Sequence, residues 1–121
     1  MGGGTKTSGG VTANINVDYN WRPNTHEIKV NRVYGNWIPS SNTYTVSNRK
    51  VNAHNGGVGK SLKELSAIPL YNSFSYGTSN WGYNQVVTGD HGARAWSSAT
   101  VKAYGMSGTS HTITVNVWVP N

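Results

Sequence analysis

The sequence predicts an all-β protein that folds as a single antiparallel β-sandwich of about seven short strands, with a small β-barrel as the alternative. The first observation is composition: thirteen Val, five Ile and twelve Thr stand against three Leu, two Met, two Glu and one Gln, so strand formers far outnumber helix formers. The second is that Ser, Thr, Asn and Gly recur between short apolar segments, as in strands joined by many turns. With 121 residues, the chain has the length of one domain.

The glycine-rich segment 1–10 is predicted to be a flexible leader or a vector-derived scar. It shows neither apolar alternation nor the apolar stretch of a signal peptide. We therefore expect any signal peptide to be absent from this sequence. The single β-sandwich domain would then occupy residues 11–120.

Residues 11–19 carry the clearest strand pattern. Apolar residues occupy every second position from Val11 to Tyr19, and a period of two predicts a half-buried strand. In the next strand the alternation weakens at Arg32 and Val33, which indicates either a β-bulge or a short inner face. Further strands are expected at residues 26–34, 43–53 (one bent strand or two short ones), 74–76, 83–88, 93–104 and 109–119.

Residues 61–67 are the only segment with a helical pattern. Ser61 can cap a helix, Glu64 three residues later would complete a capping box, and Pro69 prevents extension. The sequence therefore predicts a short helix of one or two turns, preceded by a glycine loop at residues 55–59.

The last two predicted strands are the longest and define two faces of their sheet. Apolar residues at every second position up to Val119, and alanines at alternate positions around Ala95, are expected to face the core. Trp96, Tyr104 and Trp118 fall on the other phase. Because paired antiparallel strands bring such residues close together, we expect an aromatic group on one non-core face.

The aromatic residues are the most informative excess, with five Trp, seven Tyr and one Phe. A group of exposed indole rings indicates a binding surface, since aromatic faces stack on sugar rings and planar polar groups bond sugar hydroxyls. The alternative is that a loop or the predicted helix covers these rings as a second small core. The predicted ligand-binding residues are Trp21, Trp37, Trp81, Arg94, Trp96, Lys102, Tyr104 and Trp118.

Charge and composition indicate partners and location. The formal net charge is +6 and the pI about 9.8, which favours cell-wall polymers, anionic lipid or nucleic acid as partners. The chain has no cysteine, which excludes disulfides and thiolate metal sites. Its richness in Asn, Thr, Ser, Tyr and Trp predicts an exported bacterial protein, secreted or at the cell surface.

We predict no enzymatic activity and no cofactor. The chain has only four carboxylates, the pair Asp90 and His91 lacks a serine elbow, and the four histidines fit no metal-ligand spacing. Residues 55–61 resemble the deviant Walker A motif of the MinD and ParA class of ATPases through their glycines, Lys60 and Ser61. That class needs a parallel sheet with several helices, which this composition excludes.

Three function classes follow, in order of preference. The first is a non-catalytic module that binds a polysaccharide or an anionic cell-wall polymer. The second is a secreted antibacterial or membrane-active β-protein: residues 93–101 resemble the lactococcin-type β-sandwich bacteriocins, and interfacial Trp with cationic charge suits an anionic membrane. The third is binding of single-stranded nucleic acid, ranked last because the basic residues are dispersed.

Overall fold

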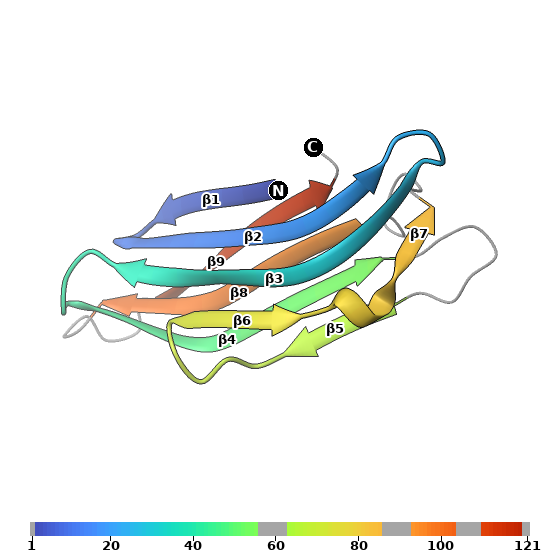
Figure 1. The fold of residues 1–121 in the computed structure, drawn as a ribbon. Coiled ribbons are helices and arrows are strands. Elements are labelled where there is room, and N and C mark those ends of the chain that lie inside the picture. The colour runs from blue at the N-terminus through green and yellow to red at the C-terminus, as the bar shows by residue number, and fades with distance from the viewer. Residues whose placement is uncertain (1, 56–62, 86–92, 104–109, 120–121) are drawn as a thin grey trace.

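The computed structural model describes residues 2–55, 63–85, 93–103 and 110–119. They form two antiparallel sheets that pack face to face and do not close into a barrel (Figure 1). The predicted β-sandwich is confirmed, and the small barrel is not the fold. The described residues form nine strands where about seven were expected, because segments 2–8 and 63–67 are strands as well.

The first sheet, sheet A, is built around the β2–β3 hairpin. β1 pairs with β2, while β6 and β7 both pair with the far side of β3. The register of β2 on β3 shifts after Asp18 and skips Asn31, which confirms the bulge predicted beside Arg32. The strands of sheet A are β1 (Gly2–Ser8), β2 (Val11–Arg22), β3 (Glu27–Pro39), β6 (Ser73–Gly77) and β7 (Tyr83–Gln85).

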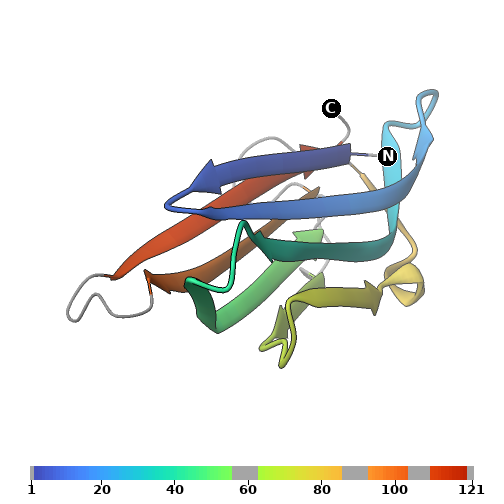
Figure 2. The same cartoon turned by 90° about the vertical axis from the view of Figure 1, so that its left-hand side faces the viewer.

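The second sheet, sheet B, has the strand order β5–β4–β8–β9. β4 is one strand bent by a bulge between Ser47 and Lys50, where Asn48 has a positive φ of 51°. Figure 2 shows the strands of the two sheets running in similar directions, as in an aligned sandwich. The strands of sheet B are β4 (Tyr44–Asn55), β5 (Lys63–Ala67), β8 (Ala93–Ala103) and β9 (Ser110–Val119).

Alternating apolar side chains of both sheets fill the space between them. In β2 every second residue from Val11 to Val17 is buried, and in β9 every second residue from Ile113 to Val119. On β8, Ala93, Ala95 and Ala99 are buried as well, while Ala103 at the end of the strand is half-buried. The inward phases predicted for these three strands are therefore confirmed, and so, by alternation, are their outward phases.

Residues 2–8 are not the flexible leader that we predicted but form the edge strand β1. They pair with β2 along their full length and contact β9 of the other sheet. Glycine permits this contact, because a Cβ atom at Gly4 would lie only 2.8 Å from the carbonyl oxygen of Asn116. Gly9 and Gly10, with φ of 57° and 90°, turn the chain into β2. The lack of bulky side chains, which suggested a leader, is what lets β1 approach β9.

Residues 63–67 form strand β5 rather than the predicted helix. β5 pairs with β4, so that Ala67 lies opposite Val51 and Lys63 opposite Asn55. Strand pairing outweighs the local helical pattern here, since helix propensity is a weak preference that tertiary contacts override. The predicted cap, Ser61, and the glycine loop from residue 56 onward lie outside the described residues.

Helical structure within the described ranges is limited to one 3-10 turn, η1 (Ser79–Trp81), between β6 and β7. No helix in this part of the chain is long and apolar enough to cross a membrane. The strand predicted at residues 83–88 is present as β7, and its remainder lies outside the described residues.

Candidate binding site

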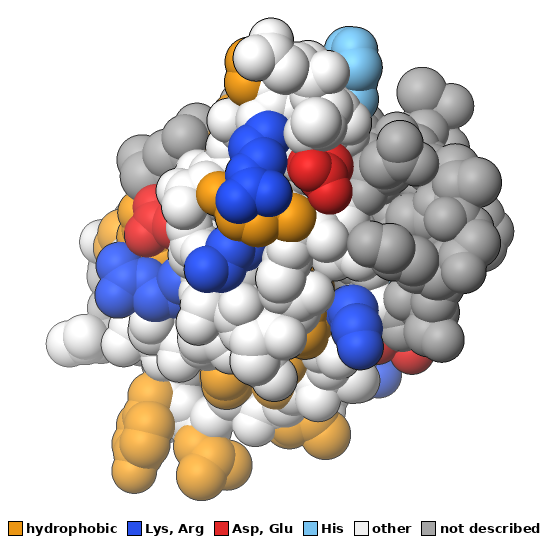
Figure 3. Space-filling view, turned by 45° about the vertical axis from the view of Figure 1, so that its right-hand side comes forward, with side chains coloured by type: hydrophobic (Ala, Val, Ile, Leu, Met, Phe, Trp, Pro, Cys, Tyr) orange, Lys and Arg blue, Asp and Glu red, His pale blue; other side chains and the backbone are white. Residues whose placement is uncertain are grey.

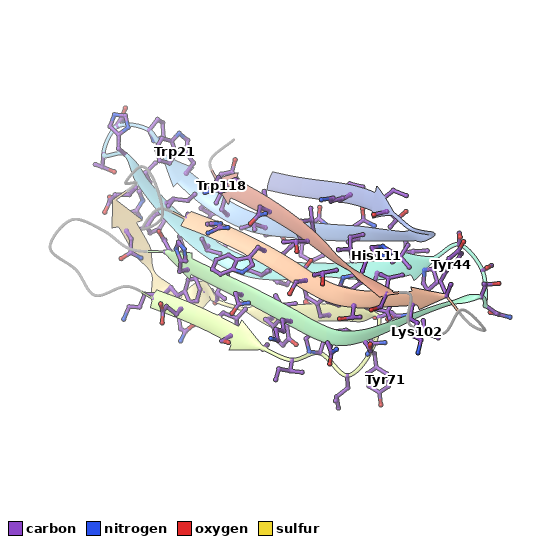
Figure 4. The ribbon with its side chains drawn as sticks, turned by 180° about the vertical axis from the view of Figure 1, so that it is seen from behind. Trp21, Tyr44, Tyr71, Lys102, His111 and Trp118 are labelled. Atoms are coloured by element: carbon purple, nitrogen blue, oxygen red, sulfur yellow. The ribbon has the colours of Figure 1, made fainter. Side chains whose placement is uncertain are left out.

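The candidate site is the outer face of sheet B, which points away from sheet A and toward the viewer in Figure 4. On β8 the buried alanines alternate with Arg94 and Trp96, which lie on this outer face. Pairing with β9 sets Arg94 opposite Trp118 and Trp96 opposite Asn116. The structure thus places Trp96 and Trp118 on one non-core face, as expected from their phase in the sequence.

Arg94 links the two indole rings. Its guanidinium carbon, Cζ, lies 4.3 Å from the ring centroid of Trp96 and 5.0 Å from that of Trp118. Its Nη2 donates a hydrogen bond of 2.6 Å to Oδ1 of Asn116. We call Arg94, Trp96, Asn116 and Trp118 the tryptophan–arginine cluster. These contacts restrict the side-chain rotamers, so the cluster is a preformed surface.

His54 of β4 extends this arrangement across a third strand. Its imidazole meets Trp96 edge-on, with ring centroids 5.4 Å apart and an interplanar angle of 70°. Strand pairing places His54 opposite Arg94 on one side and opposite Glu64 of β5 on the other. One row of side chains therefore crosses all four strands of sheet B, in the order Glu64, His54, Arg94 and Trp118.

A hollow of about 240 Å³ lies beside this row, between β5, β4 and β8. Its walls combine the indole ring of Trp96 and the apolar side chains of Ala53 and Leu65 with polar groups. Among these, the amide, hydroxyl and carboxylate groups can bond a polar ligand. Glu64, which we expected in the capping box of a short helix, lines this hollow instead. Within the described ranges no three His, Asp or Glu residues gather to hold a metal ion. The lining residues are Asn52, Ala53, His54, Glu64, Leu65, Ser66 and Trp96.

A second hollow, of about 270 Å³, lies further along the same strands. Lys50 contributes an ammonium group to it, and Ser98 and Thr100 contribute hydroxyls. Nδ2 of Asn48, in the bulge of β4, donates a hydrogen bond of 3.3 Å to Oγ1 of Thr100. Lys50 is two residues from Asn52 of the first hollow, about 7 Å along the strand. The two hollows therefore adjoin on one face.

Trp118 is the most accessible part of the cluster. Its side chain is 51% exposed, whereas Trp96 is half-buried and in contact with both His54 and Arg94. A covered second core, the alternative that the sequence left open, therefore does not describe Trp118. The indole ring of Trp118 is thus accessible to solvent, whereas that of Trp96 packs against His54 and Arg94.

Trp37 is a core residue and not the ligand-binding residue that we predicted. Its side chain is only 1% exposed and packs on Phe74, with ring centroids 5.3 Å apart. We expected this strand to end at residue 34, but β3 continues to Pro39 and its alternation points Trp37 between the sheets.

The remaining predicted residues lie apart from the cluster. Trp21 of β2 and Trp81 of η1 are half-buried and pack against the core. Lys102 is exposed toward the opposite end of β8, about 26 Å from Arg94 at 3.3 Å per residue (Figure 4). Tyr104 lies outside the described residues.

Sequence reasoning missed Asn52, His54 and Glu64 as site residues. The signal for two of them is present, because Asn52 and His54 alternate with the apolar Val51 and Ala53 and so belong to an outward phase. The pairing of β4 with β8 could not be predicted from the local pattern, because it joins segments far apart in the chain.

No protein-family model, curated protein or solved structure matches the chain. Analogy with a known fold therefore contributes nothing here, and function has to be argued from the side chains of the candidate site. Those side chains are aromatic rings, amides, hydroxyls and cations arranged on one open sheet face.

Proposed function

We propose that this protein is a non-catalytic module that binds carbohydrate, either a polysaccharide or an anionic cell-wall polymer, on the outer face of sheet B. The observation that supports this most is the tryptophan–arginine cluster, in which the accessible ring of Trp118 is held against Arg94. A fixed and accessible indole offers a flat apolar surface with a negative π face, which suits the C–H face of a sugar ring.

The polar groups around the two hollows complement sugar hydroxyls. Asn52 and Ser66 line the first hollow, and Ser98 and Thr100 line the second. Amide and hydroxyl groups both donate and accept hydrogen bonds, as sugar hydroxyls do. Volumes of about 240 and 270 Å³ are below the ~300–1,000 Å³ that is usual for pockets enclosing a small molecule. Adjoining shallow hollows on an open face favour an extended polymer.

The charges on this face favour an anionic polymer. Lys50 lines the second hollow and Arg94 lies at the centre of the cluster, while Glu64 lines the first hollow. The formal net charge of +6 adds a long-range attraction to phosphate or carboxylate groups.

The proposal is tested with a glycan array and a cell-wall pull-down, using the wild type, Trp118→Ala and the control Trp21→Ala. Trp21 is matched in residue type but belongs to sheet A. We expect saturable binding that Trp118→Ala weakens about tenfold or more and that Trp21→Ala leaves unchanged. Circular dichroism verifies that each variant is folded. If no polysaccharide binds, or if Trp118→Ala binds as tightly as the wild type, the proposal is wrong.

Single-stranded nucleic acid is the competing ligand for the same surface, because bases also stack on tryptophan and phosphates bind arginine and lysine. Gel shifts with single-stranded oligonucleotides at low and high salt distinguish the two ligand classes. A tight shift that weakens steeply with salt would favour nucleic acid over carbohydrate.

A further inference from the structure

The segment between β5 and β6, residues 68–72, connects sheet B to sheet A and carries an unusual set of exposed apolar side chains. Ile68, Leu70 and Tyr71 are 74%, 78% and 76% exposed. Among the described residues, the other exposed large hydrophobic residues are Ile38 and Trp118, and they are less exposed, at 52% and 51%. The three most exposed apolar side chains therefore belong to four consecutive residues.

Hydrogen bonds hold the backbone of this segment in place. Nε of Arg49 donates to Oδ1 of Asn72 at 2.9 Å, and Nη1 of Arg49 donates to the carbonyl oxygen of Leu70 at 3.3 Å. The backbone N–H of Trp37, in the core strand β3, donates to the carbonyl oxygen of Asn72 at 2.8 Å. Pro69, between the exposed residues, is buried. The segment is thus fixed to the body of the protein while its apolar side chains point outwards.

The figures show how far these side chains project. Tyr71 points away from both sheets at one edge of the molecule, and it is remote from Trp118 in the view from behind (Figure 4). In the space-filling view, hydrophobic side chains protrude from the lower edge as separate knobs (Figure 3). We call Ile68, Leu70 and Tyr71 the apolar tip.

We propose that the apolar tip inserts into the interfacial region of an anionic lipid bilayer and so anchors the domain to a membrane surface. Ile68 and Leu70 supply aliphatic groups that can enter the acyl region. Tyr71 combines an apolar ring with a hydroxyl group, and such residues lie at headgroup depth. This surface is distinct from the candidate carbohydrate site and does not depend on it.

The size and shape of the tip favour a bilayer over a protein partner. A stable protein interface needs about 20–30 residues on each side. Three side chains that protrude from a narrow edge supply far fewer contacts than that. A bilayer, in contrast, can surround a protruding tip without matching its shape.

The surrounding charge favours anionic lipid. The guanidinium of Arg49 contacts the segment directly, and the exposed Lys50 follows it in β4. No acidic residue occurs in the sequence from Leu65 to Gly89. With a formal net charge of +6, the protein is attracted to a negatively charged surface within a Debye length of it.

The experiment is flotation of the full chain with vesicles of phosphatidylglycerol and phosphatidylcholine. We compare the wild type, the double variant Leu70→Ser/Tyr71→Ser, and Trp118→Ala as a control that removes an exposed apolar side chain remote from the tip. We expect the double variant to reduce vesicle partitioning about tenfold or more and Trp118→Ala to leave it unchanged. Absence of wild-type binding, or equal binding by the double variant, would overturn the proposal.

Two further measurements establish which surface meets the membrane and whether the tip binds a second copy of the chain. Trp118→Ala should bind vesicles as the wild type does. If it loses vesicle binding and the double variant keeps it, the membrane contact is on sheet B and the inference is wrong.

Sedimentation velocity tests whether the apolar tip instead binds a second copy of this chain. A wild-type dimer that the double variant abolishes would assign the tip to a second copy of this chain instead of a bilayer.

Discussion

The two outer faces of this sandwich are both polar, yet their side chains are arranged differently. On sheet A, Oγ1 of Thr5 donates to Oδ1 of Asn14 at 2.8 Å, and Nδ2 of Asn14 donates to Oδ1 of Asn36 at 2.9 Å. One hydrogen-bonded ladder thus crosses β1, β2 and β3. On sheet B, the row across the strands contains stacked and charged groups, with Arg94 between two tryptophans and Trp118 open to solvent.

The comparison separates stability from recognition. The polar groups of the sheet A ladder bond each other, so they hold β1 to the centre of the sheet. In the tryptophan–arginine cluster, by contrast, Trp96 lines a hollow that a ligand can enter and Trp118 is open to solvent. An outward-facing polar side chain can therefore serve either stability or binding, depending on which groups it contacts. Substitutions in the core and on the two faces test this separation.

The largest effect is expected in the core that both faces cover. Trp37→Ala should lower the free energy of unfolding by about 3–5 kcal/mol, because it removes the largest fully buried side chain and leaves a cavity beside Phe74. Urea unfolding followed by circular dichroism measures this change. A value near zero would mean that Trp37 is not a core residue and would reopen its role as a surface residue.

On sheet B, Arg94→Ala should weaken polymer binding about tenfold, equivalent to about 1.4 kcal/mol, because the indole rings lose the group that links them. Titration calorimetry with a polysaccharide found on the array measures the dissociation constant. Arg94→Lys keeps the charge but not the planar guanidinium, so it should bind almost as weakly as Arg94→Ala. Full binding by Arg94→Lys would show that charge alone matters and that the stacked geometry does not.

On sheet A, Asn14→Ala should give the smallest effect, a loss of about 1 kcal/mol in the free energy of unfolding. It breaks two side-chain hydrogen bonds on a partly solvated face, where the net contribution of each is modest. Polymer binding should be unchanged in the same calorimetric experiment. If Asn14→Ala weakened polymer binding and left the free energy of unfolding unchanged, sheet A rather than sheet B would be the binding face.

Much of the fold could be predicted because apolar alternation is a local signal. The inward phases of β2, β8 and β9, and the bulge near Arg32, were all readable from neighbouring residues. β1 and β5 could not be predicted in this way. β1 is a strand because glycines let it pack on β9, and β5 because it pairs with β4, and both contacts join residues distant in sequence.

For the candidate site, too, the local alternation could be predicted and the strand pairing could not. The shared face of Trp96 and Trp118 followed from their phase in two consecutive strands. The approach of His54 and Glu64 depends on pairing between β5, β4 and β8, which no local pattern reveals. Trp37 was assigned wrongly because the strand was predicted to end at residue 34, whereas the continuation of β3 to Pro39 buries it.

The central claim is that carbohydrate binds on the outer face of sheet B, and the five tryptophans allow it to be tested directly. Indole N–H signals in ¹⁵N NMR spectra, assigned by single substitutions, are followed during titration with the polysaccharide that binds most tightly on the array. The signals of Trp96 and Trp118 should shift and saturate together, while those of Trp21, Trp37 and Trp81 stay in place. Shifts confined to Trp21 or Trp81, or no shift at any indole during saturable binding, would contradict the account.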